Sequence, residues 1–342
     1  FRTNFTSFAN GTNRSYTLIE NQTNKFAKGE NWDAAFRVYD GTESGDWLNS
    51  TITISNTQPE NPNTTIVPSS PIKNNDLNCS FTYIDTNNDQ GTASIIWYNN
   101  SREHFRTNIS IANNSNNTII SYMLTRNTTN AFIKDQTWVC AAKTNDGVIS
   151  SDWVNASVTI GNSAPDDTTV RIDPLLPIRS SNLNASSNVS DPDADTLTVT
   201  IIWYNNSIEH FRTNITSIAN SSTSSYTLTR NNSNIFTRNE NWTAAFRLND
   251  GSFSSNWSNS SVVIQNALPN FTAYISPEIP FFSNSLNASA FVTDIDADTL
   301  TVEIVFWNGT REHFRTNLTS VANSTNISYT LLANQTNLFT YK

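Results

Sequence analysis

Three short acidic segments carry the residues best suited to hold an ion. They read Asp85-Thr86-Asn87-Asn88-Asp89, Asp191-Pro192-Asp193-Ala194-Asp195 and Asp294-Ile295-Asp296-Ala297-Asp298. Alternate side-chain oxygens on a loop can converge on a hard cation such as Ca²⁺. The segments lack the Gly and Glu positions of an EF-hand loop. Two interpretations therefore stay open. One is an Asx-rich turn between strands that holds no ion. The other is a Ca²⁺ site, whose ligands would be Asp191, Asp193, Asp195, Asp294, Asp296 and Asp298.

The histidines are the second candidate for chemistry. The chain has three, His104, His210 and His313, and each follows a Glu. One Glu-His pair per repeat supplies too few ligands for a metal cluster, so we expect a structural contact at a strand end. The sequence has no Gly-rich phosphate loop, no G-x-S-x-G and no C-x-x-C. We therefore expect no enzyme and no catalytic residues.

The most frequent motif is Asn-x-Ser/Thr, the acceptor of N-linked glycans. It occurs 29 times, and six positions keep it in every visible copy of a sequence repeat. Three of these positions appear four times: Asn4, Asn108, Asn214 and Asn317; Asn10, Asn113, Asn220 and Asn323; Asn21, Asn127, Asn231 and Asn334. Three appear three times: Asn49, Asn155 and Asn259; Asn78, Asn184 and Asn287; Asn99, Asn205 and Asn308.

At these positions the middle residue changes while the Asn and the hydroxyl remain. Duplication of an Asn-rich sequence explains the shared Asn but not a hydroxyl beside a changing neighbour. We therefore predict N-linked glycans at these residues. Hydrated sugar would replace charge as the source of solubility and would cover strand edges. It would leave little bare protein for an open cleft.

Behind these motifs lies an internal repeat. The string Phe-Arg-Thr-Asn begins at Phe1, Phe105, Phe211 and Phe314, at intervals of 103 to 106 residues. It divides the chain into a C-terminal part of a repeat, two whole repeats and an N-terminal part of a repeat. The predicted boundaries are 1–56, 57–162, 163–266 and 267–342. Because the two partial pieces overlap in sequence, we expect neighbours in a longer array.

Each repeat is predicted to be all-β. Residues 196–203 alternate, with Leu197, Val199, Ile201 and Trp203 on one face, which is typical of a half-buried strand. Further strands are predicted at 77–81, 138–143 and 157–160, and Asp-Gly turns separate them. About seven short strands per hundred residues indicate a β-sandwich. The Pro-bearing linkers 59–71, 165–177 and 269–280 favour an extended rod.

Composition excludes several classes of protein. The net charge is −9, which argues against nucleic-acid binding. No apolar run is long enough to span a membrane. Charged residues make up only 14% of the chain, against a usual quarter. The polarity comes mostly from uncharged side chains, among them 52 Asn. Aromatic residues make up 11%, which is too many for a disordered chain.

The two cysteines, Cys79 and Cys140, lie in the same repeat. Sequence alignment places Cys79 on Ala185 and Ala288, and Cys140 on Ala244 and Ala34. The two positions change together, as a disulfide would require, although two buried thiols remain the alternative. The order Cys79, Trp97, Cys140 resembles the immunoglobulin sandwich, whose disulfide packs on a strand C tryptophan. That resemblance implies a Cys79–Cys140 bridge and an oxidising compartment.

The repeats also resemble the immunoglobulin-like repeats of archaeal surface proteins. The domains of that family tend to begin with a Pro-rich strand, followed by a Leu-x-Cys strand, an acidic Asp-x-Asp turn and a Trp strand. Residues 162–203 follow this order. The likeness implies an extracellular, cell-surface location rather than a particular activity.

We expect a structural component of a glycosylated surface filament or sheath. Its partners would be copies of itself, with other surface glycoproteins open. The alternative is the stalk of an adhesin or carbohydrate-binding protein whose binding tip lies outside this sequence. A third reading, the stalk of an envelope enzyme, would require a catalytic domain elsewhere.

Overall fold

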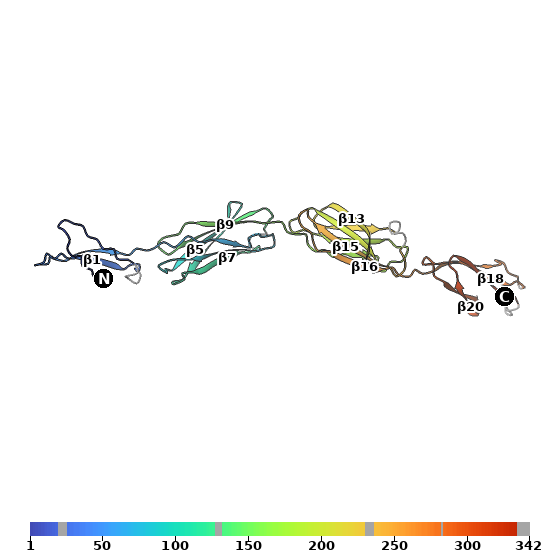
Figure 1. Cartoon of the computed structure of the whole chain (residues 1–342). Coiled ribbons are helices and arrows are strands. Elements are labelled where there is room, and N and C mark those ends of the chain that lie inside the picture. The colour runs from blue at the N-terminus through green and yellow to red at the C-terminus, as the bar shows by residue number, and fades with distance from the viewer. Residues whose placement is uncertain (20–25, 127–131, 230–235, 282, 334–342) are drawn as a thin grey trace. The chain divides into compact units, whose positions relative to one another are not determined.

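The computed structural model describes residues 1–19, 26–126, 132–229, 236–281 and 283–333. Within these ranges the protein is all-β, with 21 strands and no helix (Figure 1). Consequently, no helix in the described part of the chain could cross a membrane. The chain divides into two compact units, Phe1–Asn162 and Ser163–Lys342. Each unit holds one complete sandwich and one partial set of strands. The finer four-part division stays a prediction.

The first unit begins with an antiparallel hairpin and continues into a complete sandwich. The hairpin pairs β1 (Asn31–Phe36) with β2 (Leu48–Thr53). The sandwich strands are β3 (Thr65–Val67), β4 (Leu77–Tyr83), β5 (Gly91–Asn99), β6 (Arg102–Ile111), β7 (Thr118–Leu124), β8 (Thr137–Asn145) and β9 (Val154–Thr159). They form a three-stranded sheet in the order β3-β4-β7 and a four-stranded sheet in the order β6-β5-β8-β9.

The second unit repeats this sandwich and then most of it again. The complete copy consists of β10 (Arg171–Asp173), β11 (Leu183–Val189), β12 (Leu197–Asn205), β13 (Ile208–Ile218), β14 (Ser222–Leu228), β15 (Asn241–Asn249) and β16 (Ser258–Val263). Its sheets are β10-β11-β14 and β13-β12-β15-β16. The partial copy consists of β17 (Asn270–Ser276), β18 (Leu286–Thr293), β19 (Leu300–Asn308), β20 (Arg311–Val321) and β21 (Thr325–Leu331). Its sheets are β17-β18-β21 and β19-β20.

The predicted period-2 patterns mark the strands that face the cores. Strand β4 alternates buried and half-buried residues along its whole length. The predicted strand at 196–203 is β12, in which Leu197, Val199, Ile201 and Trp203 are fully buried. The all-β prediction and the tandem sandwiches are thus confirmed. Strand β6 pairs with β5 beside β8 and β9, so the four-stranded sheet differs from the constant-type immunoglobulin arrangement of A, B, E and D strands.

The two complete cores fill the same space with different residues. In the second repeat the three-stranded sheet supplies two large aromatic side chains, and in the third the four-stranded sheet supplies the bulk. The exchanged pairs are Phe81/Ser187 and Tyr83/Val189 on one sheet, and Ala142/Phe246 and Thr144/Leu248 on the other. Interiors are close-packed, so volume added on one sheet must be removed from the facing one. In each repeat, therefore, the side-chain volumes of the two facing sheets complement each other.

The partial copy at 267–281 and 283–333 has an open interior. Its apolar side chains line a groove of about 530 Å³, with Ala288, Val302, Ile304 and Phe306 among them. In the third repeat β15 and β16 cover the equivalent face, and the described part of the last copy has no counterpart of these strands.

Candidate functional site

A disulfide joins the two sheets of the second repeat. Cys79 on β4 and Cys140 on β8 are fully buried and bonded, with 6.3 Å between their Cα atoms. Trp97 on β5 is the register partner of Cys140 and is also fully buried. The predicted Cys–Trp–Cys arrangement is confirmed. Ala185 and Ala244 hold the same register positions in the third repeat, so that core closes without a bridge.

The three acidic segments form one kind of turn, built on the first Asp of each. In the second repeat Asp85 Oδ1 accepts hydrogen bonds from the backbone N–H groups of Asn87 (2.8 Å) and Asp89 (3.3 Å). In the third, Asp191 Oδ1 accepts from Asp193 (2.8 Å) and Asp195 (3.3 Å). Asp294 repeats this in the last copy. Such local bonds are what favours Asp in turns.

A side chain from the loop between the fourth and fifth strands of each copy (β6–β7, β13–β14 and β20–β21) completes each turn. Asn220 Oδ1 accepts the Asp191 N–H at 2.7 Å, and Asn323 Oδ1 accepts the Asp294 N–H at 2.6 Å. In the second repeat the equivalent acceptor is Asn116, at 2.9 Å from the Asp85 N. Sequence alignment had matched Asn113 to these residues. The difference arises because this loop is three residues longer between β6 and β7 than between β13 and β14.

Each turn also binds the first residue of its own repeat. The backbone N–H of Thr57 donates to Asn87 Oδ1 at 2.7 Å. In the same way the N–H of Ser163 donates to Asp193 Oδ2 at 2.5 Å, and that of Ala267 to Asp296 Oδ2 at 2.6 Å. One backbone donor thus meets the middle side chain of the turn in all three copies. The acidic turn therefore anchors the start of its repeat, a role that spacing alone did not predict.

Two of the turns carry a cationic partner from the preceding repeat. Lys28 Nζ lies 2.8 Å from Asp89 Oδ2. Arg238 Nη1 lies 2.5 Å from Asp298 Oδ2 and 2.5 Å from Asn266 Oδ1. These ion pairs are partly exposed, so they contribute little to stability.

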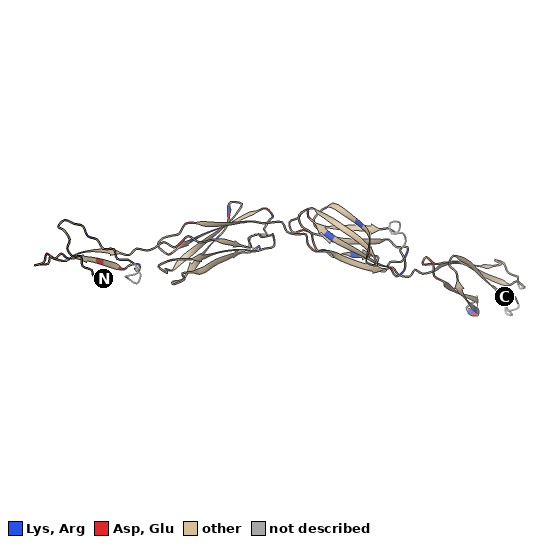
Figure 2. Ribbon diagram, viewed as in Figure 1, with Lys and Arg blue, Asp and Glu red and all other residues tan. Residues whose placement is uncertain are grey.

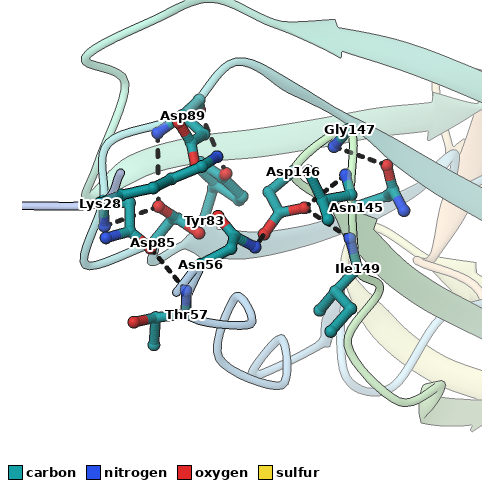
Figure 3. A network of polar contacts seen from close by, with 12 residues as sticks. Lys28, Asn56, Thr57, Tyr83, Asp85, Asp89, Asn145, Asp146, Gly147 and Ile149 are labelled. Carbon is teal, nitrogen blue, oxygen red and sulfur yellow. Dashed lines mark hydrogen bonds and ion pairs between the residues drawn. The ribbon is translucent and has the colours of Figure 1, made fainter. Parts of the chain in front are cut away.

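In the second repeat a second loop brings a further carboxylate to the turn. Asp146, in the β8–β9 hairpin, accepts hydrogen bonds from the N–H groups of Val148 (2.8 Å) and Ile149 (2.7 Å). Its other oxygen accepts the Asn56 Nδ2–H at 2.7 Å (Figure 3). Sequence analysis identified the Asn145-Asp146-Gly147 turn but missed its place beside Asp85 and Asp89.

Burial and charge shift the acidity of this region. Burial, with Asp85, Asp146 and Asp89 nearby, raises the pKa of Tyr83 to about 12. Burial also acts to raise the pKa of Asp146, but hydrogen bonds from Ile149, Asn56 and Val148 outweigh it and leave that pKa lowered. In the third repeat burial raises the pKa of Asp191. Burial thus works against ionisation of all three side chains, and only at Asp146 do hydrogen bonds outweigh it.

Several oxygens in these turns and in the segments bound to them are buried without a hydrogen-bond partner. They include Asp85 Oδ2 in the second repeat and Asn56 Oδ1 just before it. In the third repeat they include Asp191 Oδ2, Asp193 Oδ1 and Ser163 Oγ. Each copy also brings three carboxylates together, with one oxygen from each lying within 4.8 Å of the others. The groups are Asp85, Asp89 and Asp146; Asp191, Asp193 and Asp195; and Asp294, Asp296 and Asp298.

The Glu-His pairs do not act together. Glu103 accepts two hydrogen bonds from Arg106, each 3.0 Å long, and these lower the pKa of its carboxyl. His104 instead packs edge-on against Trp138, with 4.9 Å between ring centroids. His210 repeats this contact with Trp242 at the same distance. These are the strand-end contacts that the sequence predicted.

Two sequon positions lie on the edges of the four-stranded sheets. Asn108 is on β6 and Asn155 on β9, the two edge strands of the second repeat. Asn214 on β13 and Asn259 on β16 occupy the edges of the third. All four side chains are exposed, as are Asn49 on β2 and Asn317 on β20.

The other sequon positions differ in how far their side chains are exposed. Asn78, Asn184 and Asn287, on central strands, are half-buried. Asn99 and Asn205 are half-buried with their carbonyl oxygens unpartnered, whereas Asn308 is exposed. Asn4, Asn10 and Asn113 are exposed. Asn21, Asn127, Asn231 and Asn334 lie outside the described residues.

Comparison with known proteins found no matching family model and no matching curated sequence. Among solved structures, the chain resembles the PKD domain of an M14-like peptidase from a Thermoplasmatales archaeon, with 18% identity over 31% of this chain and 99% of that one and a TM-score of 0.26. It also resembles a two-domain fibronectin type III segment of chicken tenascin (9% identity, 60% and 98% covered, TM-score 0.30). The chicken interferon gamma receptor alpha chain is similar as well, with 12% identity over 60% of this chain and 98% of that one and a TM-score of 0.31. At these scores the fold rests on the strand pairing and the disulfide described above.

Proposed function

We propose that this chain is a structural component of an extracellular surface filament or sheath, in which tandem sandwiches act as N-glycosylated spacers. The observation that carries the proposal is the placing of sequons on both edge strands of each complete four-stranded sheet. An unpaired strand edge invites association with other chains. A glycan on each edge strand would block that pairing sterically.

The charge distribution supports the same role. Charged residues are few and most of the ribbon carries none (Figure 2). Large apolar side chains nevertheless lie at the surface, with Ile119 72% and Ile208 74% exposed. Proteins usually keep such a surface soluble with charge. Here hydrated sugar would supply the solubility that charge does not.

The disulfide supports an extracellular location, because such bonds persist in oxidising compartments. The resemblance of the repeats to those of archaeal surface proteins supports a location on an archaeal cell surface. In this proposal the partners are copies of the chain within a filament, and the linkers hold the sandwiches in an extended rod. The proposal includes no enzymatic activity.

Imaging of native material tests the proposal. Antibody raised against residues 163–266 should label filaments or sheaths on intact cells continuously along their length by electron microscopy. Label confined to the base of particles that end in a different domain would indicate a stalk and contradict the filament. Label inside cells only would contradict the location.

A further inference from the structure

We propose that the second repeat contains a Ca²⁺ site shared by two of its loops and the residue that directly precedes the repeat. The ligands are Asp85 and Asp89 of the acidic turn, Asp146 of the β8–β9 hairpin and Asn56, the last residue before the repeat. This site includes two residues, Asp146 and Asn56, that lie far in sequence from the acidic segment. It does not depend on glycosylation or on the filament proposed above.

The first argument is an oxygen that the protein leaves unpartnered. Asp85 is fully buried, and its Oδ1 holds the turn by accepting two backbone hydrogen bonds. Its Oδ2 has no hydrogen-bond partner. A buried carboxylate oxygen without a partner is costly. A bound cation would supply the missing interaction without disturbing the turn.

The second argument is a further unpartnered oxygen beside it. The Asn56 Nδ2 group donates to Asp146, which directs the amide toward the cluster, while its buried Oδ1 has no partner (Figure 3). Carboxylate and amide carbonyl oxygens are the ligands that Ca²⁺ takes from proteins. The unpartnered atoms are thus of the right chemical type.

The third argument is geometric. One oxygen from each of Asp85, Asp89 and Asp146 lies within 4.8 Å of the others. With Ca–O distances of 2.3–2.6 Å, two ligands on opposite sides of one ion are at most about 5 Å apart. The spacing of the three carboxylates is therefore compatible with one shared ion.

Charge gives the fourth argument. Three carboxylates face one ammonium group, that of Lys28 at 2.8 Å from Asp89. The cluster thus keeps a formal charge of −2, which one divalent ion neutralises. Mg²⁺ demands shorter distances and near-octahedral geometry, whereas Ca²⁺ accepts irregular geometry. A site whose ligands come from separate loops therefore favours Ca²⁺. We expect a Kd of about 0.1–1 mM, the range of extracellular calcium modules.

The neighbouring Tyr83 provides a probe that is specific to this repeat. Its hydroxyl donates to the Asp89 carbonyl at 3.2 Å, and Val189 stands at its position in the third repeat. Tyrosine sensitises the luminescence of bound Tb³⁺, an oxygen-seeking ion close to Ca²⁺ in size. Titration of the full chain with TbCl₃, followed by displacement with CaCl₂, therefore reads out this site, and Tyr83→Phe identifies the signal that comes from it.

The decisive variant is Asp85→Asn, which keeps Oδ1 as an acceptor for the turn and removes the charged Oδ2. We expect it to abolish the Tyr83-dependent signal or weaken Tb³⁺ and Ca²⁺ binding at least tenfold. Calorimetry with CaCl₂ should show one site fewer than the unmodified chain. Asp46→Asn, the control, removes an exposed carboxylate of the same unit. It should change neither the Tyr83-dependent Tb³⁺ signal nor the number of Ca²⁺ sites.

Two further variants keep the test valid if Asp85→Asn does not fold. Asn56→Ala leaves the turn intact and should weaken Ca²⁺ several-fold. Lys28→Ala removes the competing ammonium group and should tighten Ca²⁺ binding. No Tyr83-dependent Tb³⁺ signal in the unmodified chain would overturn the proposal. So would Ca²⁺ affinity that is unaffected by Asp85→Asn and Asn56→Ala.

Discussion

At the scale of single residues, the acidic turns combine good hydrogen bonding with backbone strain. Ala194 and Ala297 have φ of +66° and +62°, and Asn88 holds the same position at +58°. The left-handed region costs an ordinary residue about 1–2 kcal/mol, and Asn tolerates it better than Ala. The third repeat and the last copy thus accept a penalty that the second avoids.

Replacing Ala194 with Gly tests this reading. The Ala194→Gly variant should stabilise the third repeat by about 1 kcal/mol, because relief of the left-handed strain exceeds the added freedom of the unfolded chain. Native-state hydrogen exchange of the β12 amides would measure the change. Ala164→Gly, at a residue outside the left-handed region, should lower stability. A loss for both variants would show that the turn is not strained.

The turn chemistry could be predicted from residue types only in part. The sequence identified Asp-rich turns and left open whether they hold an ion. It did not predict the backbone donors of Thr57, Ser163 and Ala267, because a main-chain N–H has no sequence signature. Asp146 was missed as a neighbour of Asp85 because 61 residues separate them, and only the pairing of β5 with β8 brings their loops together.

At the scale of elements, the strands that could be predicted from the sequence are those with one buried face. Strand β12 begins and ends within two residues of its prediction, since Leu197, Val199, Ile201 and Trp203 alternate with Thr and face one core. The pairing of β6 with β5 could not be predicted from the sequence, because an edge strand with mostly exposed polar residues has no pattern of buried apolar residues. The exchange of core volume between sheets was hidden for a similar reason: it is a property of facing pairs, not of any one strand.

The disulfide should matter in one repeat only. Cys79→Ala with Cys140→Ala reproduces the Ala185/Ala244 pair of the third repeat. Because the bond closes a loop of 61 residues, its removal should cost about 4 kcal/mol of stability in the second repeat. This cost arises in the unfolded chain, so it does not depend on which sheet supplies the bulk of the core.

Hydrogen exchange of individual strands distinguishes this outcome from a general effect. Protection should fall in β4 and β8 and stay unchanged in β11 and β15. Unchanged protection in β4 would mean that the second core is as self-sufficient as the third. An equal fall in both repeats would mean that they do not unfold separately.

At the scale of the whole molecule, we expect sugar at the sheet edges to prevent association between chains. We expect that replacing Asn108, Asn155, Asn214 and Asn259 with Gln, in a host that glycosylates the chain, will cause association through the exposed edges of β6, β9, β13 and β16. Light scattering at rising concentration would detect it. A variant with Gln at Asn4, Asn10, Asn13 and Asn63, which are exposed sequons outside those four strands, should remain dispersed. Equal association of the two variants would contradict the edge argument.

The most direct test of the central claim is site-resolved mass spectrometry of glycopeptides from native material. We expect nearly full occupancy at the exposed edge residues Asn108, Asn155, Asn214 and Asn259. Occupancy should be lower at Asn220 and Asn323, whose amides are engaged by the acidic turns. Unmodified Asn at most edge positions would contradict the claim that a glycan coat is the working surface of this protein.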